Sequence, residues 1–360
     1  MAISSMTRPK MLASLLLAGG SWLLGPTRVV AQSKPAFRLP SPDSLRSWMA
    51  RSHVPVVGVG LIKRGRVRRV RVVGELRPGV PAPPNTLFPV ASLTKPLVTL
   101  TVLQLVQRGQ WSLDEPLMRY WTDPDLATDP QLPRLTTRLV LSHQTGFPNW
   151  RYQLPGHRLA FLHAPGTTYG YSGEGFEYLR QALERKFGCP LQQLSDAVLG
   201  RPLRLRDTRY SWAGDTQVDS TRLAVGHDAR GAVVRTPKPA APNAADGLVT
   251  TMRDYTRFGA WVVRHAGLSD TLFRAMVAPV VSTGSPNQFM SLGWEVRPVR
   301  SQPGQEYLLV HSGRDEGLLT LIVLLPRSRR GLVILTNADN GGQVAIQVLR
   351  ATLNLPELAP

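Results

Sequence analysis

The pattern of hydrophobic and polar positions changes its period twice along the chain. Residues 54–62 and 67–74 are β-branched runs on either side of residues 63–66, a pattern that predicts two strands joined by a hairpin. Residues 111–260 are rich in helical periods and loops. The strand period then returns in four further runs, at 291–299, 306–311, 318–325 and 331–336.

Helical periodicity predicts the remaining elements. Residues 97–106 are apolar nearly all round, and Gly109 ends the run, which predicts a buried helix. Pro96 is tolerated only in the first turn of a helix, so this helix should begin within a residue or two of Ser92. We expect further helices at 39–52, 135–142, 174–187, 190–199, 252–265 and 342–353.

Strands at both ends of the chain, with helices inserted between them, indicate an α/β (α+β) fold. We expect one antiparallel sheet made of N- and C-terminal strands, flanked by helices, with an inserted and mainly helical lobe. The α/β part should comprise about 39–91 and 265–360, and the lobe about 92–264. The cleft between the two parts is the expected site.

The N-terminus has the composition of an export signal. Arg8 and Lys10 precede an apolar run, and small residues end at Ala31. We expect residues 1–31 to be removed, leaving a domain of 32–360 that is periplasmic or secreted. The alternative is an uncleaved membrane anchor, although the apolar run is short for a span.

Composition excludes several classes of function. The chain has 360 residues, a single cysteine and a net charge of +19. One cysteine allows no intrachain disulfide, and we expect Cys189 to be a small core residue. No metal spacing or phosphate-binding glycine loop is present, so no cofactor is expected. The charge comes with no nucleic-acid motif, and the arginines at 64–71 alternate with valine as on the outer face of a strand. We therefore expect no nucleic-acid partner, and at most weak association with an anionic envelope surface.

The strongest candidate chemistry lies in Ser92-Leu93-Thr94-Lys95 at the head of the apolar helix. Positions i and i+3 share a helix face, so the lysine amine can reach the serine hydroxyl. Serine becomes a good nucleophile when a base takes its proton, and a buried lysine can act as that base if burial lowers its pKa. On its own the tetrapeptide favours an ordinary helix start, with Ser92 as the cap and Lys95 in solvent.

Two later motifs supply the partners of such a pair. Tyr171 lies in Tyr171-Ser172-Gly173, and a tyrosine beside a lysine ammonium loses its proton more easily and can relay protons. His311-Ser312-Gly313 is expected to end a strand, where the glycine lets substrate lie against the strand edge. The backbone amides of Arg314 and Ser92 would then form a two-donor oxyanion hole.

With these three motifs in this order, the chain resembles the serine β-lactamase and penicillin-binding protein family. It is nearest the branch that holds class C β-lactamases, D-Ala-D-Ala carboxypeptidases, D-aminopeptidases and related esterases. The likeness covers roughly residues 40–350 and includes the blocks LTTRLVLSHQTGFP, APGTTYGYSGEGFEYL and DGLVTTMRDYTRFG. It implies that Ser92 is acylated and that Lys95 and Tyr171 share the proton transfers, with the choice of base left open. It also implies that His311 lines the substrate edge and that His143 has only a structural place.

Two departures from the family pattern bear on the substrate. The family's asparagine after the tyrosine is Gly173 here, which we still expect beside the substrate, with Glu174 as a partial substitute for the asparagine. The third motif begins with His311, where β-lactamases usually have lysine, and a histidine of ordinary pKa is mostly neutral at pH 7. Arg314 or Arg297 would have to supply the missing cation.

These changes favour an esterase or peptidase-like serine hydrolase over an efficient β-lactamase. The expected substrate is a small-molecule or peptide-like ester or amide, with peptidoglycan-derived compounds included. The alternatives are a β-lactamase or D-Ala-D-Ala carboxypeptidase, or a catalytically silent member of the same fold that binds peptidoglycan or a protein partner. The shape of the pocket depends on the loops around Trp150, 213–245 and 279–290.

Overall fold

The antiparallel sheet predicted from the two ends of the chain is present in the computed structural model, which describes residues 37–210, 217–234, 241–299, 301, 304–353 and 355. The signal expected at 1–31 lies outside the described residues, as do parts of the loop 213–245. Among the residues described, no helix has the length and apolar character needed to cross a membrane.

The described part of the main sheet has nine strands in the order β3-β2-β1-β12-β11-β10-β9-β8-β7. The N-terminal strand β1 (Val56–Lys63) pairs with the C-terminal strand β12 (Arg330–Thr336), with Val59 opposite Ile334. The other strands are β2 (Arg66–Arg77), β3 (Val80–Pro81), β7 (Val281–Ser282), β8 (Phe289–Met290), β9 (Glu295–Pro298), β10 (Tyr307–Asp315) and β11 (Leu318–Leu325). A small second sheet contains β4 (Leu87–Pro89), β6 (Leu248–Thr251) and β5 (Arg209–Tyr210).

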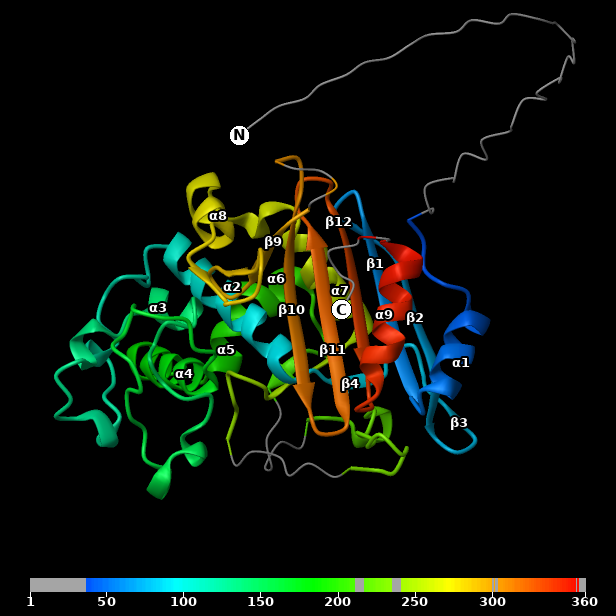
Figure 1. The fold of residues 1–360 in the computed structure, drawn as a ribbon, viewed down its shortest axis with the longest axis horizontal. Helices are drawn as coiled ribbons and strands as arrows, with labels where there is room; N and C mark the ends of the chain where they lie inside the picture. Colours follow the sequence, from blue (N-terminus) through cyan, green and yellow to red (C-terminus); the bar gives the residue numbers. More distant parts are fainter. Residues whose placement is uncertain are drawn as a thin grey trace, which may run out of the picture. The chain divides into compact units, whose positions relative to one another are not determined.

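Helices cover both faces of the sheet (Figure 1). Most of them lie in the part of the sequence between the N-terminal and the C-terminal strands. The helices α1 and α9 pack together on one face, and α7 packs on β1, β2 and β12 from the other. The helices are α1 (Pro42–Arg51), α2 (Thr94–Gln107), α3 (Thr137–Leu141), α4 (Gly173–Phe187), α5 (Leu191–Ser195), α6 (Arg201–Leu203), α7 (Met252–Val262), α8 (Asp270–Val277) and α9 (Gly341–Thr352).

Alternation along β1 divides the hydrophobic core between the two faces. Val57 and Val59 belong to the cluster with α1 and α9, whereas Val56 belongs to the larger cluster that continues into the helical part. Gly60 faces α7, because a Cβ placed on it would lie 1.9 Å from Oγ1 of Thr256. The glycine therefore allows the close approach of helix and strand.

Several elements differ in extent from the sequence expectation. The strand expected at 291–299 is reduced to β9, because Gly293 has a φ of 73° and its amide donates to the carbonyl of Leu141 at 2.7 Å. The strand expected at 306–311 continues to Asp315. The helix expected at 190–199 is divided into α5 and a π-helical turn, Asp196–Gly200. Cys189 is half-buried and packs against the core.

The arginine cluster lies along β2, as its alternation with valine predicts. Arg66, Arg68 and Arg69 are exposed, while Val67 and Val70 pack against the core. The cluster is thus the solvent face of a strand near the edge of the sheet.

Candidate active site

Ser92 lies in a single 3₁₀ turn, Ala91–Leu93, between β4 and α2. Ala91 has a φ of 45°, a conformation that costs a residue with a Cβ of order 1–3 kcal/mol and persists only where its surroundings hold it. Thr94 Oγ1 donates to the Ala91 carbonyl at 2.7 Å, and the hydroxyl of Tyr255 donates to the Leu93 carbonyl at 2.7 Å. The turn that presents Ser92 is therefore fixed by contacts on both sides.

Lys95 reaches Ser92 as the i, i+3 spacing predicts. Its Nζ donates to Ser92 Oγ at 3.0 Å and to the carbonyl of Ala245 at 2.9 Å, and the side chain is 1% exposed. Burial lowers the pKa of Lys95 to about 7, against the carboxylates of Asp246 and Glu177, which raise it. A substantial fraction of the amine is therefore neutral at pH 7 and can accept the serine proton.

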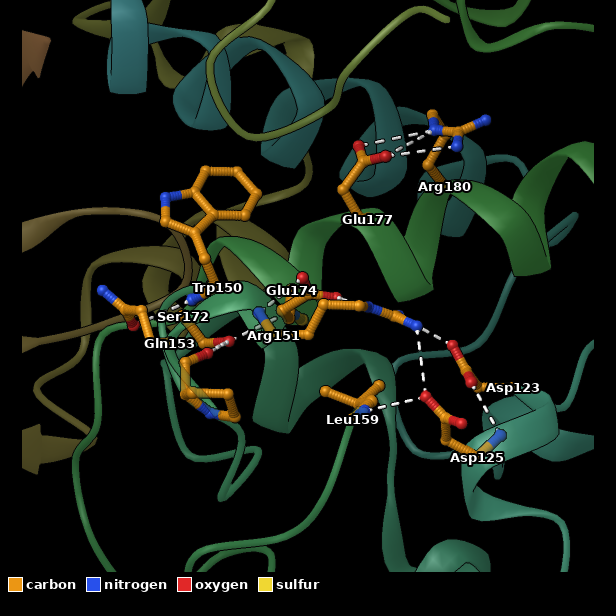
Figure 2. Close-up of polar contacts among 12 residues, drawn as sticks. Asp123, Asp125, Trp150, Arg151, Gln153, Leu159, Ser172, Glu174, Glu177 and Arg180 are labelled. Carbon is orange, nitrogen blue, oxygen red and sulfur yellow. Dashed lines mark hydrogen bonds and ion pairs between the residues drawn. The ribbon is translucent and has the colours of Figure 1, made fainter. Parts of the chain in front are cut away.

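The loop that contacts Lys95 is itself held by α4. Asn243 Oδ1 accepts hydrogen bonds from the amides of Ala245 and Asp246 at 2.7 and 3.0 Å. Glu177 accepts from the Ala244 amide and pairs with Arg180 on the same helix (Figure 2). Glu177 thus supports the carbonyl that binds Lys95 and adds negative charge nearby.

Tyr171 lies beside the lysine but is not a stronger acid than an ordinary tyrosine. Lys95 Nζ is 4.7 Å from the centre of the Tyr171 ring. Burial raises the pKa of Tyr171, and a side-chain hydrogen bond with Ser92 only partly offsets the rise. The expectation that the neighbouring lysine eases loss of the tyrosine proton is therefore wrong, because desolvation outweighs it. The phenol remains protonated at neutral pH.

His143 fixes the position of Tyr171. Its ring is stacked on the Tyr171 ring, with centres 4.2 Å apart, and its Nδ1 accepts from the Ser172 amide at 3.1 Å. Burial lowers the pKa of His143 well below its usual value, so the ring is neutral. His143 thus supports the Tyr171 segment, which is a structural place of the kind expected from the sequence.

His311 lies inside β10 and not at its end. Strand β9 pairs with β10 only as far as Val310, so the segment from His311 onward leaves that edge uncovered by β9. Burial, together with the charge of Lys95, lowers the pKa of His311 to about 3. Nδ1 of the neutral ring is 2.9 Å from the Ser312 carbonyl, to which it can donate, and Nε2 then acts as an acceptor.

Gly313 allows β10 to approach the nucleophile. A Cβ on Gly313 would lie 2.2 Å from the Val90 carbonyl and 3.1 Å from the Ser92 nitrogen. Thr320 on β11 also donates to the Val90 carbonyl, at 2.8 Å. The segment before Ser92 is thereby attached to the sheet, with the Arg314 amide next in the chain.

The predicted residues converge on one cavity of about 340 Å³. Ser92, Lys95, Tyr171, His311 and Arg314 all line it. Three carboxylates that were not predicted from the sequence line the same cavity: Asp246, Glu295 and Asp315. Their positions depend on chain segments that meet only in the fold, and no local motif marks them.

Arg297 does not supply a free cation, because it is paired with Glu295. Arg314 and the partly neutral Lys95 are the cations that line the cavity within the described chain. The cavity is therefore acidic, although the chain as a whole is strongly basic. Among the residues described, no group of three or more histidine, cysteine or carboxylate side chains is arranged to hold a metal ion.

Gly173 and Glu174 do not have the roles expected of them. Neither lines the cavity; Trp150 lies beside Gly173 and lines the cavity itself. Glu174 points to Arg151, which it binds at 2.9 Å and which also binds Asp123 at 2.7 Å (Figure 2). Glu174 therefore does not replace the asparagine of the family pattern.

Comparison with known proteins shows the family to which the chain belongs. The beta-lactamase family model matches residues 43–355. The chain is 32% identical to Esterase EstB of Burkholderia gladioli over 197 residues, which cover 47% of this chain and 48% of that protein. The match to this relative thus spans about half of its length. The chain is also 26% identical to the D-alanyl-D-alanine-carboxypeptidase/endopeptidase AmpH of Escherichia coli K12, over 75% of this chain and 76% of that protein.

Solved structures show the same fold. An octameric penicillin-binding protein homologue from Pyrococcus abyssi superposes with a TM-score of 0.73 at 20% identity, over 88% of this chain and 78% of that chain. A beta-lactamase/D-alanine carboxypeptidase from Pseudomonas syringae superposes with a TM-score of 0.70 at 18% identity, over 89% and 100%. From the family match and the convergence of the three motifs, the chain belongs to the β-lactamase family of serine hydrolases.

Proposed function

We propose that the protein hydrolyses small neutral esters, and the related amides more slowly, through an acyl-enzyme on Ser92. The observation that carries this proposal is the 3.0 Å hydrogen bond between Lys95 and Ser92, combined with the lowered pKa of the buried lysine. These are the requirements for an activated serine.

Acylation uses the groups that line the cavity. Ser92 Oγ attacks the substrate carbonyl carbon while its proton passes to neutral Lys95. The backbone amides of Ser92 and Arg314 stabilise the oxyanion, and each such donor contributes about 10²–10³ in rate. The Tyr171 hydroxyl gives a proton to the leaving oxygen and regains one from the Lys95 ammonium. Water, deprotonated by the same pair, then releases the acid and restores Ser92.

The charge of the cavity favours neutral substrates over anionic ones. The carboxylates of Asp246 and Asp315 would repel a substrate carboxylate, and His311 is neutral where many β-lactamases have a lysine. Penicillins and peptides that end in D-alanine both carry such a carboxylate. We therefore place ester hydrolysis ahead of β-lactamase or carboxypeptidase activity, with Arg314 as the cation that would serve these alternatives.

We also propose export to the periplasm or medium, on the composition of residues 1–31. Substrates derived from peptidoglycan would be accessible there. Fractionation of cells that express the full chain, with N-terminal sequencing of the product, tests this. A product that starts at residue 32 supports export, and an intact N-terminus in the cytoplasm contradicts it.

A substrate panel tests the activity. We expect p-nitrophenyl acetate and butyrate to be hydrolysed with higher kcat/KM than nitrocefin or D-amino-acid amides, and all activity to be lost in Ser92→Ala. A fluorophosphonate probe should label the native protein but not this variant. An absence of both labelling and hydrolysis would support the alternative of a catalytically silent binding protein.

A further inference from the structure

Trp150 lines both the catalytic cavity and a second cavity. The second cavity has a volume of about 600 Å³ and is lined by aromatic and polar side chains that include Trp121, Tyr178 and Gln181. Of the described residues, only Trp150 lines both cavities. Trp150 is therefore the residue that the two cavities share, and we refer to it as the wall.

The indole ring occupies the space that a side chain at position 173 would need. A Cβ on Gly173 would lie 2.7, 2.8 and 3.0 Å from three carbons of the Trp150 ring. Gly173 is the first residue of α4 and does not have a positive φ, so its backbone would accept other residues. Glycine is required here by the tryptophan and not by the local conformation.

Hydrogen bonds and ion pairs of Trp150 and of the residues before and after it fix the loop that carries the indole ring. The amide of Trp150 donates to Gln153 Oε1 at 3.2 Å, and the Gly173 amide donates to Asn149 Oδ1 at 2.9 Å. Arg151 is anchored to Glu174 and Asp123 in a direction different from that of the indole ring (Figure 2). These contacts hold the wall in place without using the indole itself.

We propose that Trp150 determines the substrate size that the enzyme accepts, and that Gly173 is the small residue that this wall requires. The inference rests on the proposed ester hydrolysis at Ser92. The substrate group directed towards Trp150 must be short enough to end at the indole face. A longer chain would have to enter the second cavity, which the ring closes.

Two ester series test the wall. One varies the acyl chain, as p-nitrophenyl acetate, butyrate and octanoate, and the other varies the alcohol, as phenyl, 2-naphthyl and octyl acetate. Trp150→Ala should raise the ratio of kcat/KM for the longest substrate to that for the shortest by about tenfold or more in one series. Trp150→Phe should give a smaller rise. Leu162→Ala is the control, because this apolar residue is 51% exposed and lines neither cavity.

A thermal double-mutant cycle tests the size relationship without any substrate. Gly173→Ala should lower the Tm by several degrees when Trp150 is present and by much less in Trp150→Ala. Gly170→Ala is the control, since its Cβ would meet no atom within 4 Å. Equal destabilisation by Gly173→Ala in both backgrounds would overturn the steric relationship.

The two proposals fail separately. Unchanged length ratios in both ester series, with the Trp150→Ala protein folded and active, would overturn the role of Trp150 while ester hydrolysis stands. If no ester is hydrolysed but fluorophosphonates label Ser92, the proposed function fails. The role of Trp150 is then decided by the ratio of the labelling rates for long and short alkyl fluorophosphonates, compared between Trp150→Ala and the native protein.

Discussion

The amine of Lys95 lies 3.0 Å from the hydroxyl oxygen of Ser92, within a cavity wall where the lysine is almost completely buried. A fully charged lysine in that position could donate a hydrogen bond to the serine oxygen but could not accept the serine proton. Because burial lowers the lysine pKa to about 7, the same contact serves for proton removal. The chemistry of the site thus depends on the protonation state of one amine.

Activity on a neutral ester should rise with pH through about 7 and level off above it. Below the lowered pKa of Lys95 the amine is protonated and cannot accept the serine proton; above it the amine is neutral. His311, with its pKa lowered to about 3, stays neutral over the range and adds no second limb. Lys95→Arg should reduce kcat/KM by about 10²–10⁴, since arginine keeps its proton. A flat kcat/KM profile between pH 5 and 9 would contradict this mechanism.

Asp246→Asn should move the acidic limb of that profile to lower pH. The Asp246 carboxylate raises the pKa of Lys95, so its removal favours the neutral amine. The shift is measured from kcat/KM against pH with p-nitrophenyl acetate. Asp43→Asn is the control, because this side chain on α1 is 87% exposed and should leave the profile unchanged. A shift to higher pH would show that Asp246 does not act through the lysine.

Tyr171→Phe should reduce kcat by about 10²–10⁴ and leave the fold intact. The variant loses the hydroxyl that is hydrogen bonded with Ser92 and keeps the ring stacked on His143. Circular dichroism and Tm should therefore match the native protein. Near-native turnover would remove the phenol from the proton transfers.

Gly313→Ala should lower both activity and stability. The new methyl group would meet the Val90 carbonyl at 2.2 Å and separate β10 from the Ser92 turn. Displacement of the oxyanion donors should reduce kcat by about 10²–10³. Gly342→Ala on α9 provides the comparison, since its Cβ would make only an ordinary contact with Leu319 at 3.5 Å. Native activity in Gly313→Ala would show that this approach is not required.

The sequence was sufficient for the features that follow from short spacings and periodicity. The positions of Ser92 and Lys95 follow from three residues on one helix face, and the shared sheet follows from strand runs at both ends. The order of the three motifs also predicted that Tyr171 and His311 would lie near Ser92. All four line the same cavity.

Features that depend on burial or on distant segments were beyond the sequence. The acidity of Tyr171 was predicted with the wrong sign, because its desolvation is a property of the folded cavity. Glu174 follows the tyrosine motif closely, yet it turns to Arg151 in the folded loop. The fit between Gly173 and Trp150 joins positions whose proximity no local pattern encodes.

The position of the Ser92 turn depends on how closely the helix α7 packs against strand β1. Gly60 admits Thr256 against the sheet, and the adjacent Tyr255 holds the backbone carbonyl that follows Ser92. A methyl group added at Gly60 would push the helix outward and withdraw that support. Loss of turnover can thus originate at a strand that never meets a substrate, and random mutagenesis screens for impaired catalysis should recover changes there.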